Sequence, residues 1–148
     1  MWMDKYLEFS VDQDLDAEVS TILSTSQVDL SVVRDIGAGV PLYLVMVVTE
    51  AFTDGGDAAT LEVRLVSDDT ATIHASTSTL HFSSGAMLKA KLPIKAKFIW
   101  PLPWEGNAYE QFIGVNYVIA TAGFDAGWVT TFITSDPSAW KAYPDASN

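Results

Sequence analysis

A short glycine-rich turn that leads directly into a long apolar strand constrains the fold of this chain most strongly. Residues 35–48 have the sequence DIGAGVPLYLVMVV. Gly37 and Gly39 can adopt positive φ angles, which suits a tight turn, and Pro41 lacks the N–H donor that a central strand needs. The β-branched and aromatic residues of 42–48 are typical of a buried strand. Here the glycine turn precedes the strand, whereas phosphate-binding loops run from strand to glycines to helix, so we expect no phosphate site. A turn followed by a buried strand instead predicts a β-sandwich.

Strands and turns alternate along the rest of the chain, and no segment shows sustained helical periodicity with caps. Residues 60–66 alternate cleanly between apolar and polar side chains, and the Asp-Gly-Gly-Asp sequence at 54–57 is a strong turn signal. We expect strands within 20–33, 42–52, 60–66, 72–82, 87–100 (two strands, broken at Pro93), 111–120 and 128–134. Seven to nine strands at such spacings predict an all-β antiparallel sandwich over residues 19–148, preceded by an arm over residues 1–18.

The composition is that of an acidic globular domain. With 148 residues and 49 % hydrophobic content, the chain can bury a core without a disulfide or a metal, and it has no cysteine. The formal net charge of −11 argues against partners such as nucleic acids and anionic membranes. Asp4 and Glu8 stand where a secretory leader would be basic and then apolar, and the longest apolar run, 40–48, is shorter than a membrane helix. We expect a soluble protein that is neither secreted by the usual route nor inserted into a membrane, and that does not bind nucleic acid.

The first 18 residues combine six acidic residues with large apolar side chains. Two interpretations are open: an arm that docks on a partner through Trp2, Tyr6 and Phe9, or a first strand followed by a solvated acidic turn. The carboxylates of 12–18 fall on alternate residues, as at the start of a calcium loop. However, an alanine and a leucine stand where that loop needs glycine and glutamate, so we expect no metal.

No constellation of residues predicts catalysis. His74 and His81 are seven residues apart, which places them on opposite faces of a continuous strand, where they cannot share a metal or a proton. There is no Gly-x-Ser-x-Gly sequence for a nucleophile. Glu105 and Glu110 flank an aromatic loop as a glycosidase pair would, but paired carboxylates are common in an acidic chain. We therefore expect no catalytic residue, no cofactor and no metal.

Half of the eight basic residues lie within nine positions, at Lys89, Lys91, Lys95 and Lys97. Odd-numbered residues of a strand share a face, so the lysines are expected to form a stripe on each strand of this segment. Lysines on an edge strand would block aggregation between sheets. Alternatively, they form an electropositive strip for an acidic partner, such as the acidic arm of a neighbouring copy. The two roles are compatible.

The densest aromatic cluster comprises Trp100, Pro101, Pro103, Trp104 and Tyr109. Tryptophans fill cores, and they are also enriched at protein interfaces because they bury a large area and keep a polar handle. A carbohydrate platform would have a similar composition. A carbohydrate-binding β-sandwich module that uses the loop from Trp100 to Trp104 is therefore the alternative function.

Short motifs over nearly the whole chain resemble, in the same order, those of small phage capsid cement (decoration) proteins of the Bordetella-phage type. They are Asp4-Lys5, Phe9-Ser10, Gln13, Asp35-Ile-Gly-Ala-Gly followed by Pro-Leu-Tyr-Leu-Val, Ala51-Phe52-Thr53, Ala59-Thr60-Leu61, Phe82-Ser83-Ser84-Gly85, the Pro-Leu-Pro of 101–103, Gly114-Val115-Asn116-Tyr117, and Gly123-Phe124 with Gly127.

The resemblance implies a jelly-roll β-sandwich on the outside of a phage head, which bridges neighbouring major capsid protein subunits and reinforces the shell. Such a protein is not an enzyme and needs no cofactor. We expect virion localisation after synthesis in the host cytoplasm, and self-association into symmetric dimers or trimers. The expected partner contacts are the aromatic anchors and the lysine strip, namely Trp2, Tyr6, Phe9, Lys89, Lys91, Lys95, Lys97, Trp100 and Trp104.

Overall fold

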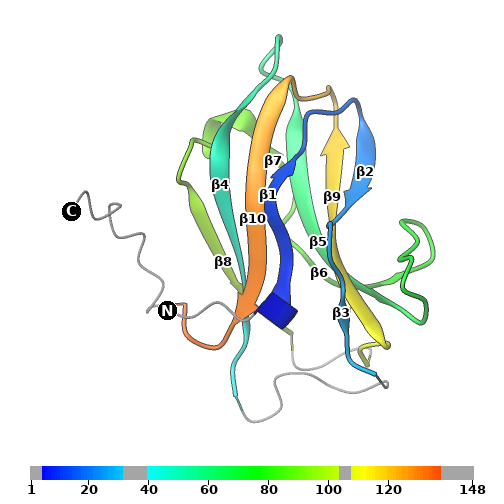
Figure 1. Ribbon diagram of the computed structural model, residues 1–148. Coiled ribbons are helices and arrows are strands. Elements are labelled where there is room, and N and C mark those ends of the chain that lie inside the picture. The colour runs from blue at the N-terminus through cyan, green and yellow to red at the C-terminus, as the bar shows by residue number, and fades with distance from the viewer. Residues whose placement is uncertain (1–4, 32–39, 104–107, 138–148) are drawn as a thin grey trace.

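The computed structural model describes residues 5–31, 40–103 and 108–137, which form two antiparallel sheets packed face to face (Figure 1). The strands are β1 (Glu8–Asp14), β2 (Ser20–Leu23), β3 (Val28–Asp29), β4 (Tyr43–Thr53), β5 (Thr60–Asp68), β6 (Thr79–Ser83), β7 (Met87–Leu88), β8 (Lys97–Pro101), β9 (Phe112–Ala120) and β10 (Ala126–Thr134). Two short 3-10 helices are present in this part of the chain, η1 (Lys5–Leu7) and η2 (Lys89–Lys91).

The strand order identifies the sandwich as a jelly roll. One sheet has the order β1-β10-β4-β8, and the other has the order β2-β9-β5-β6, with β3 paired to β9 and β7 paired to β5. The chain passes from the first sheet to the second between β1 and β2, β4 and β5, and β8 and β9, so it wraps around the core as a jelly roll does. The predicted all-β, jelly-roll-like antiparallel sandwich is confirmed.

Most strands lie where the sequence predicts them, and the main difference falls in residues 72–82. Only 79–83 form a strand there, because residues 69–78 are folded into a compact loop. The Asp68 carboxylate accepts hydrogen bonds from the backbone N–H of Thr70 at 3.3 Å and of His74 at 3.0 Å. A side chain that satisfies two backbone donors in this way competes with strand pairing, as aspartate does in turns.

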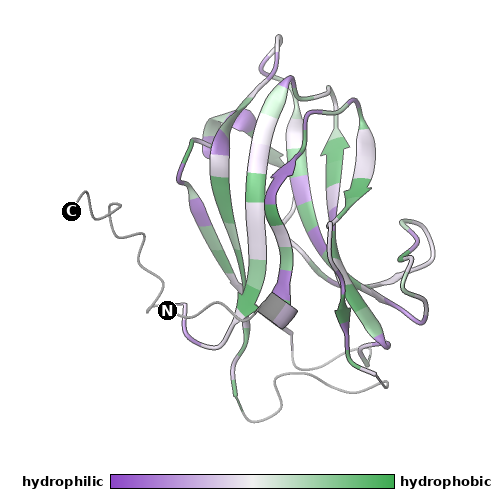
Figure 2. Cartoon of the chain, viewed as in Figure 1, coloured by the Kyte–Doolittle hydropathy of each residue, from purple (hydrophilic) through white to green (hydrophobic). Residues whose placement is uncertain are grey.

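Apolar and polar residues alternate along several strands (Figure 2), and the core forms because the apolar residues are buried together between the sheets. Leu44, Met46 and Val48 of β4 and the inward-facing apolar residues of β5 and β9 are almost completely buried. Two glycines of the predicted motifs permit close backbone approaches at one end of this core. A Cβ atom at Gly123 would lie 2.8 Å from the Ala17 carbonyl oxygen, and one at Gly127, where φ is +150°, would overlap the Phe52 ring.

A buried polar network joins the two sheets through the hydroxyl group of Tyr117 on β9. This hydroxyl lies 2.9 Å from Ser10 Oγ on β1 and donates to Thr131 Oγ1 on β10 at 2.8 Å. The Ser10 hydroxyl also donates to Gln13 Oε1 at 2.5 Å. Burial raises the pKa of Tyr117 to about 12, so the phenol stays protonated and available as a donor.

The expectation of a separate arm over residues 1–18 is wrong for residues 8–15. β1 is hydrogen-bonded to β10 along its length, and Phe9 and Leu15 are completely buried in the core. The first strand followed by an exposed acidic turn is therefore the correct interpretation of this part of the segment. Trp2 lies outside the described residues, whereas the Tyr6 side chain is 86 % exposed.

We expect Phe9→Ala to lower the free energy of unfolding by about 3–5 kcal/mol, because it opens a cavity in the core. Tyr6→Ala, which truncates an exposed side chain nearby in the sequence, should change this free energy by less than about 0.5 kcal/mol. Urea unfolding followed by tryptophan fluorescence measures both. Similar losses in the two variants would contradict the assignment of Phe9 to the core.

We expect Tyr117→Phe to destabilise the protein by about 1–3 kcal/mol, because the buried hydroxyls of Ser10 and Thr131 each lose a partner. Tyr43→Phe removes the same atom from a half-buried side chain and is the matched control. Thermal unfolding of the two variants should show a clear loss only for Tyr117→Phe, and equal melting temperatures would argue against the network.

Candidate interaction surfaces

The four clustered lysines do not form the predicted stripe on two strands. Lys89 and Lys91 belong to η2, Lys95 lies in a turn with φ of +67°, and only Lys97 is on a strand, at the start of β8. The segment turns here because Pro93 cannot donate to a sheet and because the Ala96 N–H donates instead to the Pro93 carbonyl oxygen at 3.0 Å. The lysines therefore lie around the start of β8 and do not form a stripe on each of two strands.

Lys89 has a structural role that distinguishes it from its neighbours. Its ammonium group lies 3.2 Å from Oδ1 of Asp54 and also contacts Asp57. The other carboxylate oxygen of Asp54 accepts the N–H groups of Ala58 and Ala59, both at 2.9 Å. These backbone hydrogen bonds, more than the ion pair, lower the pKa of Asp54. Lys89 is thus held at the 54–59 turn, while Lys91, Lys95 and Lys97 are exposed.

β8 forms an edge of the four-stranded sheet within the described residues, as the edge interpretation of the lysines requires. Backbone hydrogen bonds join β8 and the residue that follows it to β4 and the residue that precedes it. For example, the Leu102 N–H donates to the Leu42 carbonyl oxygen at 2.9 Å. By the alternation of an antiparallel pair, Lys97, Ile99 and Pro101 direct their backbone groups away from β4. A lysine and a proline at these positions are typical protection against indiscriminate strand pairing.

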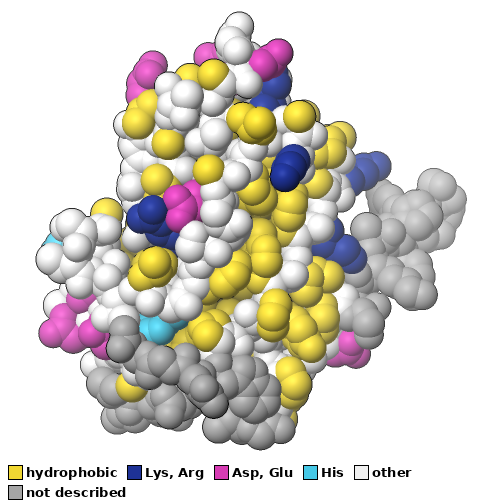
Figure 3. All heavy atoms as spheres, turned by 180° about the vertical axis from the view of Figure 1, so that it is seen from behind, with side chains coloured by type: hydrophobic (Ala, Val, Ile, Leu, Met, Phe, Trp, Pro, Cys, Tyr) yellow, Lys and Arg dark blue, Asp and Glu magenta, His cyan; other side chains and the backbone are white. Residues whose placement is uncertain are grey.

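The aromatic residues next to this edge form a packed cluster. The Trp100 ring lies 5.6 Å from that of Phe98 and 5.5 Å from that of Phe82 on β6, and all three side chains are half-buried. Viewed from behind, hydrophobic side chains form a band through the middle of the molecule, with lysine and arginine side chains beside it (Figure 3). Trp104 lies outside the described residues. Within the described residues, the predicted carbohydrate platform is therefore a packed aromatic cluster between β8 and β6.

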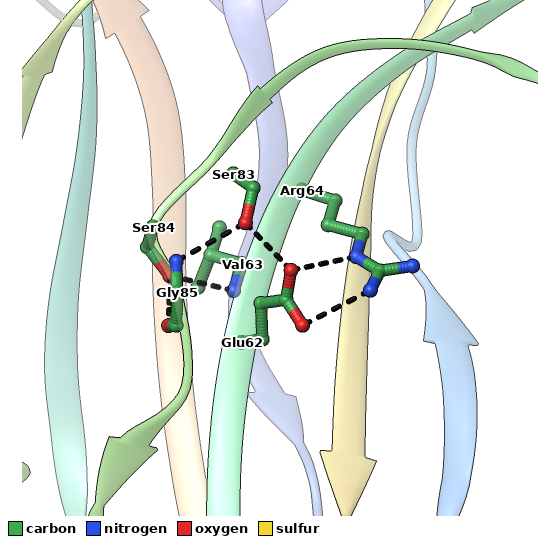
Figure 4. Close-up of polar contacts among 6 residues, drawn as sticks. All are labelled: Glu62, Val63, Arg64, Ser83, Ser84 and Gly85. Atoms are coloured by element: carbon green, nitrogen blue, oxygen red, sulfur yellow. Dashed lines mark hydrogen bonds and ion pairs between the residues drawn. The ribbon is translucent and has the colours of Figure 1, made fainter.

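The Phe-Ser-Ser-Gly motif of residues 82–85 ends β6 and leads into β7, and both of these strands pair with β5 (Figure 4). Ser83 Oγ donates to Glu62 at 2.6 Å, and Ser84 Oγ accepts the Val63 N–H at 2.9 Å. Glu62 also accepts two hydrogen bonds from the Arg64 guanidinium. This contact is the main cause of the lowered pKa of Glu62. The motif is explained by this local structure, because the Ser84 hydroxyl takes the place of a backbone partner for Val63 and the Ser83 hydroxyl binds the Glu62 carboxylate.

The two histidines lie in separate environments. His81 Nε2 is 2.6 Å from Ser67 Oγ, and its ring is stacked on Tyr109 with a centroid distance of 3.9 Å. Ser67 is completely buried and also accepts the Glu110 N–H at 3.1 Å, so the cluster fastens residues 109–110 to β5. His74 lies in the 69–78 loop beside Asp68. Glu105, the other half of the considered glycosidase pair, lies outside the described residues.

Neither a metal-binding cluster nor a membrane-spanning helix occurs among the described residues. No group of three or more His, Cys, Asp or Glu side chains in this part of the chain is arranged to hold a metal ion. None of its helices has the length and apolar character needed to cross a membrane.

Tyr6 marks the most exposed aromatic surface in the described part of the chain. η1 lies against β10, and an open depression beside it is lined by residues 6–8 and 26–29. The exposed Val40 precedes β4 at the same end of the sandwich, where the β4 register pairs Tyr43 with Pro101 and Thr134. We call this end of the sandwich, with Tyr6, Val40 and the depression, the Tyr6 end.

The acidic residues of β1 and of the turn that follows it lie at the edge opposite β8. Asp12, Asp14, Asp16 and Glu18 are all exposed, on β1 and on the turn that follows it. Asp14 Oδ1 accepts the Asp16 N–H at 2.9 Å, which is the geometry of a solvated turn. The placement of an acidic and a basic edge on one molecule was not evident from the sequence, since edges depend on sheet order.

Taken together, the fold and these surfaces define an acidic jelly-roll protein whose exposed features are apolar and charged patches. A family model described as Bbp16 matches residues 12–133, and the chain therefore belongs to the Bbp16 family, a family of Bordetella phage proteins. The resemblance to phage proteins of that type is thus confirmed, and it is consistent with a structural component of the virion. Comparison with curated proteins gives no match.

We expect acid to destabilise the protein through His81. Burial lowers the pKa of His81 below its usual value of 6.5. Below about pH 6.5 the unfolded chain therefore binds a proton at this residue that the folded chain binds only at lower pH, and the free energy of unfolding falls as the pH falls. Unfolding in urea at pH 8 and pH 5.5 should show a smaller loss for His81→Gln than for the wild type. An equal loss in both would contradict this assignment.

Proposed function

We propose that this protein is a capsid cement protein that binds the outside of a phage head, bridges major capsid protein subunits and stabilises the shell. The observation that carries the proposal is the family match over residues 12–133. The jelly-roll fold supports it, because a rigid sandwich with short connections can present several separate surfaces to a lattice. In this proposal the protein is not an enzyme, needs no cofactor, and is assembled onto the virion after synthesis in the host cytoplasm.

The capsid contact in this proposal is the Tyr6 end. A tyrosine side chain that is 86 % exposed offers a large apolar area together with a hydroxyl group, which is typical of an interface anchor. The depression beside it provides a concave surface for a side chain of the capsid protein. Phe9 is not available as an anchor, because its side chain is completely buried in the core.

The proposed mechanism is selective binding to the assembled lattice. A ligand that binds the assembled, expanded shell but not free subunits stabilises the shell by mass action. Many copies on one shell make the effect collective. We further propose that the copies self-associate into a symmetric dimer or trimer. Contacts between copies would then add to the stability of the assembled shell. With a formal charge of −11, the protein is not expected to bind the packaged nucleic acid.

We expect the purified chain to cosediment with empty expanded capsids from the same source and to raise their melting temperature. Tyr6→Ala should weaken capsid binding by about 10- to 100-fold, since burial of one large side chain contributes roughly 1.5–3 kcal/mol. Val19→Ala is the matched control, because this residue is exposed to 57 % and lies beside the start of β2, at the opposite end of the sandwich. Saturation binding with a fixed amount of capsid measures both affinities.

The two results address different parts of the proposal. Failure of the wild-type chain to bind capsids would refute the cement function. Full-strength binding by Tyr6→Ala would leave the function in place and would move the contact away from the Tyr6 end.

A further inference from the structure

The two lateral edges of the sandwich carry opposite charge. Residues 86–103, which include η2 and β8, contain four lysines and no acidic residue, whereas residues 6–20, which include β1, contain five acidic residues and no basic one. β8 and β1 are the opposite edges of the four-stranded sheet. In a chain with a net charge of −11, the basic edge is a local reversal of sign that requires an explanation.

The opposite charges also lie at the same level of the sheet. Gln13 of β1 pairs with Val129 of β10, which pairs with Val48 of β4. On the other side of β4, Val48 exchanges hydrogen bonds with Ala96 and Lys95 at 2.9 and 2.8 Å. The register therefore places 12–14 and 95–97 in one row that crosses the sheet. If a second copy lies beside the first in the same orientation, its aspartates face these lysines.

Apolar side chains accompany the charges on both edges. Ile94 and Ile99 are 54 % and 40 % exposed beside the lysines, and Val11 is 52 % exposed beside the aspartates. The lysine and proline of β8 disfavour pairing with an uncharged strand, so an acidic edge is the partner that this edge accepts. Lys89 is engaged by Asp54 and Asp57, whereas Lys91 and Lys95 are exposed.

We propose that the β8 edge of one copy docks on the β1 edge of a second copy, in a head-to-tail contact. The contact is heterologous, because different surfaces of the two copies meet, and repetition therefore extends it into a ring or a row. The inference rests on the proposed function only for its role on the shell, where such contacts would link neighbouring cement proteins laterally. The association itself is a property of the isolated chain and can be tested without capsids.

Two charge-reversed variants of the full chain test the contact. One carries Lys91→Glu, Lys95→Glu and Lys97→Glu, and the other carries Asp14→Lys, Asp16→Lys and Glu18→Lys. Asp12 is left unchanged because its φ of +46° favours aspartate over lysine. A third variant, Ala75→Glu, Ser76→Glu and Thr77→Glu, adds negative charge on the exposed 69–78 loop as the control. Circular dichroism and melting establish that each variant is folded.

Sedimentation velocity over a range of protein and salt concentrations gives the decisive measurement. We expect wild-type association to weaken about tenfold or more as the salt concentration rises from 50 to 500 mM, and the loop variant to associate as the wild type does. Each edge variant alone should lose association by about tenfold or more. An equimolar mixture of the two should regain it, because each then finds the complementary edge on the other.

Three results would overturn the inference. They are a wild-type chain that stays monomeric at all concentrations, edge variants that associate as the wild type does, and edge variants that both lose association but do not recover it when mixed. None of these results bears on whether the wild-type chain binds capsids, so the failure of this contact and the failure of the proposed function are distinguishable.

Discussion

The pairing of the first strand with the last is the interaction on which the arrangement of this molecule depends. β1 joins β10 across more than a hundred residues of sequence, and the Tyr117 hydroxyl ties both strands to the opposite sheet through Ser10 and Thr131. This closure buries Phe9 and Leu15, and it makes β1 one edge of a sheet whose other edge is β8. The acidic and basic segments therefore become opposite flanks of one rigid body.

That arrangement separates the structural residues from the surfaces available to partners. Hydroxyl and carboxylate groups at the turns, such as Ser83, Ser84 and Asp54, satisfy backbone donors or ion pairs close by in the fold. The motifs that resemble the phage family are in these places explained by hydrogen bonding and close packing. The exposed Tyr6 and the exposed side chains of the two charged edges are the surfaces that the proposed contacts with a capsid and with a second copy use.

The outcome of the aromatic and lysine predictions illustrates how far local patterns reach. The sequence singles out Trp100 and the lysine segment, but period-two reasoning places the lysines in a stripe on each of two strands. A proline and a turn at 93–96 interrupt the strand, and Lys89 pairs with aspartates more than thirty residues earlier in the chain. Such a pairing is a long-range contact, for which a single sequence contains no direct evidence.

The sequence by itself determined the all-β class, most strand positions and the turns, because alternation, glycines and turn-forming aspartates are local properties of the chain. It also indicated the phage family through motifs that tight turns and close packing require. Only the tertiary structure decided that residues 8–15 belong to the core and that 69–78 form a loop around Asp68. The tertiary structure also set the two charged edges opposite each other, because strand order and register are fixed by contacts between distant segments.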